Sequence, residues 1–215
     1  AITIEQLERK YDIGKERAFA NYSFYMGTTN DNVEEVKKVD PCKVCGVKIF
    51  MGSSTGNMLV DSPLALQEIF ESSPVLIATH CEKQEIIDEN LKFYQAKYGD
   101  DIPVRFHSVI RNREACIASS KIAIALAKKN NARLHILHIS TNQEIAMLKN
   151  ERDGMAANGV DVESFIGKRE GKAIISGEVC VHYLWFCNKD YAKYGSLIRC
   201  NPSLKDAEDM EAIRE

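Results

Sequence analysis

The sequence predicts an α/β fold in which short buried strands alternate with amphipathic helices. Apolar runs at residues 44–51, 75–80 and 133–139 are each followed by a stretch with helical periodicity, the pattern of a parallel sheet with helical crossovers. These runs are apolar nearly throughout, as expected when both faces of a sheet are covered. Periodicity does not separate a closed barrel from an open doubly wound sheet. No GxGxxG or Walker sequence follows a strand, which argues against a nucleotide-binding fold.

The remaining elements follow from the same criteria. Ser62 is expected to cap a helix that has Pro63 at its first position. Ala115, Ala118 and Ile122 share one helical face, which makes the surrounding segment a helix. Helices are expected at residues 4–19, 29–38, 63–70, 83–98, 113–129, 142–149 and 205–215. Strands are expected at residues 22–26, 44–51, 75–80, 104–109, 133–139, 173–181 and 198–200. The charged, glycine-containing stretch at about 150–172 is expected to be a loop insertion.

Composition excludes several classes of function. The chain has 215 residues, a net charge of −3 and a pI of about 6.0, which does not favour a nucleic-acid or anionic-membrane partner. No apolar run reaches the ~18 residues that a membrane span requires. Seven cysteines without a dense disulfide framework favour a reducing cytoplasm. The sequence leaves the oligomeric state open, a homo-oligomer included.

Three polar residues in or at the ends of strands are candidates for chemistry. Lys48 lies inside an apolar strand, and His80 and His138 end two later ones. Polar residues at the carboxyl ends of barrel strands are where catalytic groups collect. Two neutral imidazoles that converge on one point suit a zinc ion. A lysine within an apolar strand is otherwise costly to bury as a cation.

Other interpretations stay open for these residues. A strand-end histidine is often a polar residue with a hydrogen-bond partner, and a strand lysine can lie on an edge with its amine in water. His135 points to the face opposite His138, which favours a packing role. Cys42 and Cys45 form a CxxC, which we interpret as two ordinary thiols at a strand entrance because no further zinc ligands stand out. The residues His107, Arg111, Arg113 and Glu114 are interpreted as a helix-start salt-bridge cluster, with an anion site as the alternative.

Several segments closely resemble the dihydroorotases of the amidohydrolase superfamily. The most specific is residues 46–59, GVKIFMGSSTGNML, and residues 20–27, ANYSFYMG, followed by TNDN, are similar as well. Residues 134–141, LHILHIST, resemble a strand-end motif that hydantoinases and allantoinases share. Residues 177–186, GEVCVHYLWF, and 200–205, CNPSLK, resemble two later family segments. The resemblance covers nearly the whole chain except about residues 150–172.

The resemblance implies a distorted TIM-type (β/α)8 barrel, with residues 1–215 forming a partial barrel domain of about strands 3 to 7. It implies up to two zinc ions, with carboxylated Lys48 as the bridging ligand and His80 and His138 on one metal. Asn201 would contact the substrate, whereas His182 is given no ligand role. The implied reaction interconverts N-carbamoyl-L-aspartate and L-dihydroorotate in pyrimidine biosynthesis, through attack of a metal-activated water on the ring amide.

The chain departs from the family pattern in two respects. No His-x-His pair is present, and the family's acid–base aspartate follows a strand that we expect to lie beyond this sequence, so no catalytic residue is assigned here. We therefore expect a fragment that is inactive by itself. Lys205 stands where related enzymes often have arginine. The alternatives are an allantoinase or hydantoinase acting on another cyclic ureide, and a non-catalytic scaffold of the same fold.

Overall fold

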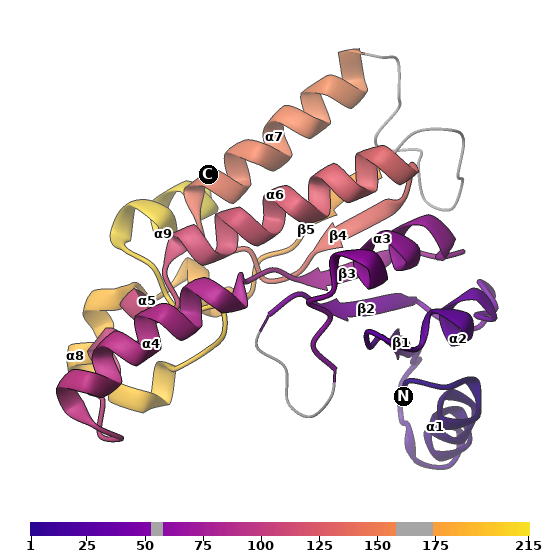
Figure 1. Ribbon diagram of the computed structural model, residues 1–215, viewed down its shortest axis with the longest axis horizontal. Helices are drawn as coiled ribbons and strands as arrows, with labels where there is room; N and C mark the ends of the chain where they lie inside the picture. Colours follow the sequence, from indigo (N-terminus) through magenta and orange to yellow (C-terminus); the bar gives the residue numbers. More distant parts are fainter. Residues whose placement is uncertain (53–57, 158–173) are drawn as a thin grey trace. The chain divides into compact units, whose positions relative to one another are not determined.

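The strands of this protein form one sheet, which confirms the predicted α/β class. The computed structural model describes residues 1–52, 58–157 and 174–215. Within them the sheet has the order β1-β2-β3-β4-β5, so every strand lies beside its neighbour in the sequence (Figure 1). β1, β2 and β3 pair in parallel. The strands are β1 (Tyr25–Gly27), β2 (Gly46–Phe50), β3 (Ile77–His80), β4 (Arg133–Ile136) and β5 (Ile174–Gly177).

Helices connect these strands, and most of them lie close to their expected bounds. Asp206 caps the last helix by accepting from the Asp209 backbone amide, as acidic N-caps commonly do. The α-helices are α1 (Ile4–Arg17), α2 (Val33–Lys37), α3 (Pro63–Ser72), α4 (Gln84–Tyr98), α5 (His107–Ile110), α6 (Arg113–Asn130), α7 (Asn142–Ala157), α8 (Tyr191–Tyr194) and α9 (Ala207–Arg214). Short 3-10 turns are η1 (Val104–Phe106), η2 (Val181–Leu184), η3 (Asn188–Asp190) and η4 (Gly195–Ile198).

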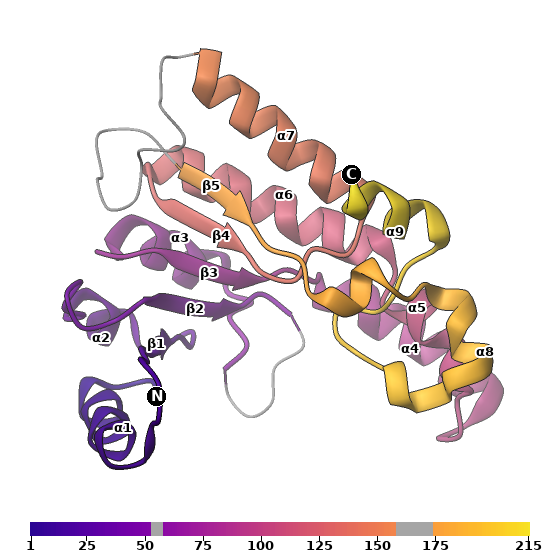
Figure 2. The ribbon, with the colours of Figure 1, turned by 180° about the vertical axis from the view of Figure 1, so that it is seen from behind.

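The chain divides into two compact units. Within the described residues, the first comprises residues 1–80, 123–135 and 174, and the second comprises residues 81–122, 136–157 and 175–215. In the first unit β2 lies between β1 and β3, as Figure 2 shows from behind. Its core is fully buried and includes Val47 and Ile49 of β2, Ile77 of β3 and Phe70 of α3. β2 is therefore an interior strand, and its position is set by burial.

The second unit contains two apolar clusters built mainly from helices and loops. In one, Ile87 of α4 packs with Ile110 of α5 and Ala115 of α6. In the other, Tyr183 and Tyr191 pack with Leu204, which precedes α9. The second cluster therefore joins segments near the carboxyl end of the chain that carry little regular secondary structure.

The expected strand at residues 104–109 is wrong, because this segment forms η1 and α5. Phe106 and Ile110 are four residues apart and share a helical face, which packs on Ile87 and Ala115. A strand would instead have put both on one face together with Ser108. Val109 is 46% exposed, because it lies on the side of α5 that faces away from this cluster. Helical spacing thus places Phe106 and Ile110 against the cluster without also directing Ser108 to the same face.

Two further expectations need correction. Residues 198–200 do not form a strand, because the chain turns at Gly195, which has a φ of +57°, and continues as η4 to Ile198. α7 extends to Ala157, so the first residues of the expected insertion at about 150–172 are helical, in keeping with the helix-forming residues of that stretch. The rest of the insertion, from residue 158 on, lies outside the described residues.

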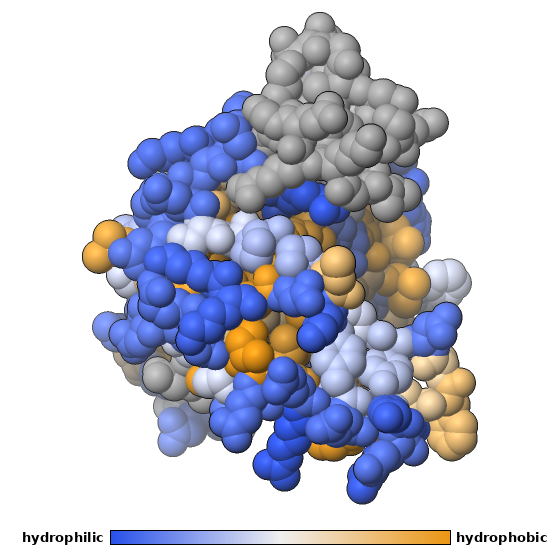
Figure 3. Space-filling view, turned by 90° about the vertical axis from the view of Figure 1, so that its right-hand side faces the viewer, coloured by the Kyte–Doolittle hydropathy of each residue, from blue (hydrophilic) through white to orange (hydrophobic). Residues whose placement is uncertain are grey.

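The surface is largely hydrophilic on the face drawn in Figure 3, where a smaller apolar area lies among charged and polar side chains. None of the helices in the part of the chain that the structure describes combines the length and apolarity that a bilayer span requires.

Ser62 generates a prediction about the stability of the first unit. Its hydroxyl oxygen accepts a hydrogen bond of 3.3 Å from the Ala65 amide at the start of α3. Ser62→Ala should lower the free energy of unfolding by about 1 kcal/mol, because an amide of the first turn loses its partner. Urea denaturation followed by circular dichroism measures the change. Ser62→Asp, which keeps an acceptor, should unfold within a few tenths of a kcal/mol of the wild type; equal losses in both variants would contradict the capping role.

Candidate functional site

Lys48 and His80 lie on the same face of the sheet in the first unit. Lys48 pairs with Ala78 across β2 and β3, and Phe50 pairs with His80. Paired residues of parallel strands, and residues two apart along a strand, point to one side of the sheet. The Phe50 ring centroid lies 6.1 Å from that of His80 and 4.5 Å from the Lys48 amine. Two of the predicted site residues are thus brought to one face of neighbouring strands, His80 at the carboxyl end of β3 and Lys48 in the middle of β2.

The strand that carries Lys48 is held in place by its opposite face. Val47 and Ile49 are 0% exposed, whereas Lys48 and Phe50 between and after them are half-buried. The Lys48 amine lies over the aromatic face of Phe50, and this cation–π contact offsets part of the cost of removing a cation from water.

His138 and Asn201 belong to the second unit. His138 follows β4 and has a φ of +41°, a left-handed conformation that residues other than glycine seldom adopt. Its neighbour Ile139 donates its amide to the Glu178 carbonyl at 2.8 Å, so the backbone at His138 is anchored beyond the end of β4. Asn201 is exposed and precedes Pro202 through a cis peptide bond. The left-handed conformation of His138 is a strained backbone at the end of a strand, which is typical of functional positions.

The structure was searched for metal-ligating clusters of histidine, cysteine, aspartate and glutamate. Within residues 1–52, 58–157 and 174–215, no group of three or more such side chains is arranged to hold a metal ion. Lysine is not among these residue types, and it becomes a ligand only as a neutral amine or a carbamate. The residues that fit a metal in the first unit are therefore His80, through an imidazole nitrogen, and Lys48, through a carbamate.

A buried ion pair in the second unit was missed by sequence reasoning. Arg111 donates to both carboxylate oxygens of Glu82, through Nε at 3.1 Å and through Nη2. The Glu82 side chain is 0% exposed and that of Arg111 9%. Glu82 comes two residues after His80, but no local pattern in the sequence points from one partner to the other, because they are 29 residues apart.

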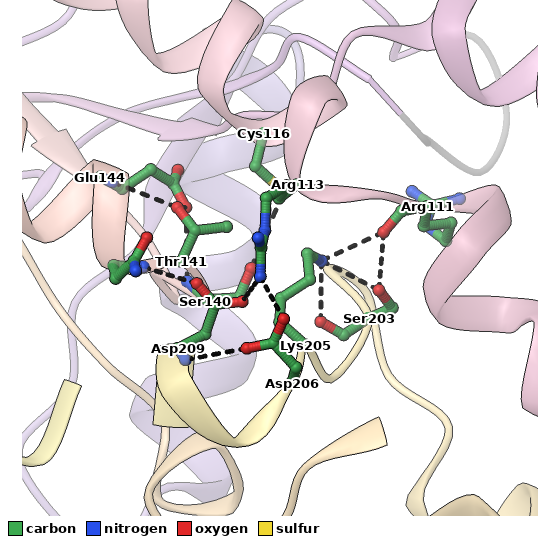
Figure 4. A network of polar contacts seen from close by, with 11 residues as sticks. Arg111, Arg113, Cys116, Ser140, Thr141, Glu144, Ser203, Lys205, Asp206 and Asp209 are labelled. Carbon is green, nitrogen blue, oxygen red and sulfur yellow. Dashed lines mark hydrogen bonds and ion pairs between the residues drawn. The ribbon is translucent and has the colours of Figure 1, made fainter. Parts of the chain in front are cut away.

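Arg111 also anchors the segment before α9 through its backbone. Its carbonyl oxygen accepts from the Ser203 hydroxyl at 2.7 Å and from the Lys205 amine at 3.1 Å (Figure 4). The same amine donates to the carbonyl and hydroxyl oxygens of Ser203, each at 2.9 Å. Because an ammonium has three donors, these three acceptors satisfy Lys205, which is 6% exposed. Lysine at this position is thus accommodated by three oxygen acceptors.

Glu144 forms the second buried part of this polar network. Its carboxylate accepts from the Ser120 hydroxyl at 2.6 Å and from the Thr141 hydroxyl at 2.9 Å. Burial raises the pKa of Glu144 above its ordinary range, and these two hydrogen bonds oppose the increase. The residues Ser140 and Thr141 of the His–Ile–Ser–Thr motif therefore precede α7 and bind its first-turn carboxylate, Ser140 through its backbone amide at 3.4 Å.

Arg113, at the start of α6, was expected in a salt-bridge cluster with His107, Arg111 and Glu114, but the ion pairs that it forms are with carboxylates near the carboxyl end of the chain. Arg113 contacts Asp206 and, at 2.7 Å, Asp209 of the last helix (Figure 4). Asp209 also accepts from the Asn142 amide at 2.9 Å. His107 is buried, which lowers its pKa, and its Nε2 lies 2.8 Å from the Cys200 carbonyl oxygen. These groups tie segments of the second unit together.

Several known proteins are similar to this chain over nearly all of its length. No protein-family profile matches the chain. An allantoinase of Deinococcus radiodurans is 25% identical over 99% of the chain and 44% of its own length. A dihydroorotase of Methanosarcina mazei is 26% identical over 96% of the chain and 42% of its own length. Among solved structures, an L-hydantoinase from Arthrobacter aurescens superposes with a TM-score of 0.80 at 21% identity, covering 98% of the chain and 44% of that protein.

The relatives named here are an allantoinase, a dihydroorotase and a hydantoinase, and the chain spans less than half the length of each. The structural likeness confirms the expected fold, an incomplete barrel of parallel strands and helices. The names of the relatives include more than one kind of amidohydrolase.

The buried pair of Glu82 and Arg111 leads to a stability prediction. Glu82→Ala should lower the free energy of unfolding by about 3–5 kcal/mol, because it leaves the Arg111 guanidinium buried without its counter-charge. Urea denaturation of the purified protein measures the loss. Replacing both partners, Glu82→Leu with Arg111→Met, should recover most of it. A double variant as unstable as the single one would show that Arg111 acts through other contacts.

Glu144 leads to a prediction about pH. Its pKa is raised in the folded state, so the stability it contributes is present below the unfolded-state pKa and is lost as the pH rises through the folded-state pKa. The contribution of Glu144 to the free energy of unfolding should therefore fall from about pH 4 upward, starting near the ordinary glutamate pKa. Urea midpoints at a series of pH values measure this slope. Glu144→Gln should flatten it while keeping the fold; an unchanged slope would contradict the assignment.

Proposed function

We propose that this chain, whose relatives are amidohydrolases along almost its whole length, is part of a metal-dependent enzyme that hydrolyses cyclic amides. The observation that carries the proposal is the placement of Lys48 and His80 on one sheet face. His80 ends β3 at the carboxyl edge of the sheet, where barrel enzymes position their chemistry, and Lys48 lies in the middle of the adjacent parallel strand β2. Packing of apolar side chains alone would not require a lysine at position 48 or a histidine at position 80.

Lys48, His80 and His138 are the residues that would hold the metal, which we take to be zinc. The neutral amine of Lys48 adds CO2 and releases a proton, and the carbamate that results is an anionic oxygen ligand. The two histidines supply imidazole nitrogens, a donor set that suits zinc. That His138 joins the other two rests on its strand-end motif. When bound, zinc supplies Lewis-acid polarisation of the substrate carbonyl and lowers the pKa of water.

The remaining residues at this face hold the ligands in position. Val47 and Ile49 fix β2 by burial, so Lys48 keeps one orientation relative to His80. The Phe50 ring lies near both side chains, with its centroid 4.5 Å from the Lys48 amine and 6.1 Å from the His80 ring centroid. A rigid strand is a more accurate support for a reacting group than a loop, because its side-chain directions are set by the sheet.

We propose dihydroorotate and its open form N-carbamoyl-aspartate as the substrate pair, in a cytoplasmic enzyme of pyrimidine synthesis. The support is the similarity of residues 46–59 to dihydroorotases, together with the relative of that name. Asn201 is the proposed substrate contact in this chain. A second candidate is allantoin, because the allantoinase of Deinococcus radiodurans matches the chain equally well. Both substrates carry a ring amide that one hydrolytic site could open.

The experiment is a side-by-side assay of the full-length protein with dihydroorotate and allantoin. Lys48→Ala should reduce turnover of the accepted substrate by more than ~10²-fold, because loss of a ligand should exceed the ~10–100-fold effect of losing an outer partner of a metal site. Lys43→Ala, an exposed lysine just before the same strand, is the matched control and should retain activity.

The outcomes separate the alternatives. If the protein hydrolyses allantoin but does not act on dihydroorotate, the proposed substrate is allantoin and not dihydroorotate. Near-normal activity of Lys48→Ala would reject Lys48 as a ligand. Metal content by mass spectrometry should fall in the same variant. A full-length protein without metal and without either activity would contradict the proposed enzyme.

A further inference from the structure

The loop before β2 exposes two cysteines that the proposed hydrolase does not use. Cys42 and Cys45 are both exposed, whereas every other cysteine among the described residues is buried or half-buried. Val44 between them is buried, so the chain directs its apolar side chain inward at that point. The two thiols therefore differ from the remaining cysteines in that small reagents can reach them in the folded protein.

Backbone hydrogen bonds define the conformation of this loop. Asp40 accepts from the Lys43 amide at 3.0 Å through its carbonyl and from the Cys42 amide at 2.9 Å through its side chain. The Cys45 amide donates to the Phe24 carbonyl at 3.3 Å, next to β1. Tyr11 of α1 donates its hydroxyl to the Lys43 carbonyl oxygen. The thiols are thus carried on a segment that is fixed at both ends.

Cys42 lines a hollow of about 750 Å³ between α1 and this loop in the first unit. Tyr11 and Tyr22 form an aromatic wall, with their ring centroids 6.0 Å apart. The volume lies within the ~300–1,000 Å³ range of small-molecule sites. The rim carries Lys43 together with Glu8 and Asp12, so both signs of charge face the hollow. Such a rim complements a small molecule that has both a carboxylate and an ammonium group.

We propose that Cys42 and Cys45 form a reversible dithiol–disulfide pair, which exchanges with small zwitterionic disulfides that dock in this hollow. The Cys42 thiolate attacks one sulfur of the small disulfide, forms a mixed disulfide and releases one small thiolate. The Cys45 thiolate then attacks the Cys42 sulfur and releases the second small thiolate. Two protein thiols are oxidised by two electrons, and one small disulfide is reduced to two thiols.

A metal site is a less suitable use of this pair. No third histidine, cysteine, aspartate or glutamate joins the two thiols in a metal-holding cluster within the part of the chain that the structure describes. A structural zinc takes four ligands as a rule. The CxxC spacing with two accessible thiols is instead the arrangement of redox-active pairs.

The test uses the full chain in its folded state, treated with oxidised glutathione and analysed by intact mass and peptide mapping. The wild type should lose two hydrogens, with a disulfide mapped to Cys42 and Cys45 and reversed by a reductant. Cys45→Ser should accumulate one glutathionyl group on Cys42, because the resolving thiol is absent. Cys180→Ser and Cys200→Ser, at half-buried positions, are matched controls that should react like the wild type.

The docking part is tested by reaction rate. Lys43→Ala should slow exchange with oxidised glutathione by about tenfold, equivalent to ~1.4 kcal/mol, and should leave exchange with uncharged 2-hydroxyethyl disulfide unchanged. Equal slowing with both reagents would overturn docking. No reaction of the folded wild type, a stable mixed disulfide on wild-type Cys42, or equal labelling of Cys180 would overturn the proposed pair.

Discussion

The ion pair between Glu82 and Arg111 is the contact on which the organisation of the second unit depends. Both side chains are withdrawn from water, so each requires the other's charge. With the guanidinium fixed in this way, the Arg111 carbonyl is also fixed, and it receives the Ser203 hydroxyl and the Lys205 amine. The segment before α9 is therefore positioned by a residue 92 and 94 positions earlier in the chain.

In the first unit the equivalent constraint is burial of one face of β2. Val47 and Ile49 are inaccessible, and a shift of one residue in register would bring them to the face that holds Lys48 and Phe50. The cost of that shift is the removal of two large side chains from the core. The register that places Lys48 and His80 on one face is thus enforced by apolar residues that take no part in the chemistry.

Sequence reasoning found the features that depend on local spacing. Ser62 before Pro63 predicted the start of α3, and apolar runs predicted β2, β3 and β4, although the strands proved shorter than the runs. The strand expected at residues 104–109 was wrong because Phe106 and Ile110 satisfy a helical face as well as an apolar run. The polar network was missed because its partners are brought together only by the tertiary fold, as Arg113 and Asp209 are, 96 residues apart.

The two ends of β2 differ in what their side chains can do. Lys48 lies in the middle of the strand, and Cys45 precedes the amino end, three residues earlier, which corresponds to about 10 Å along an extended chain. In barrels the carboxyl ends of strands carry the reaction, whereas the amino ends mainly contribute stability. Because Val47 is buried between them, a change at the thiols reaches Lys48 only by moving a core residue. Thiol exchange at the entrance of β2 would therefore act on the stability of the strand before it acted on the chemistry at its exit.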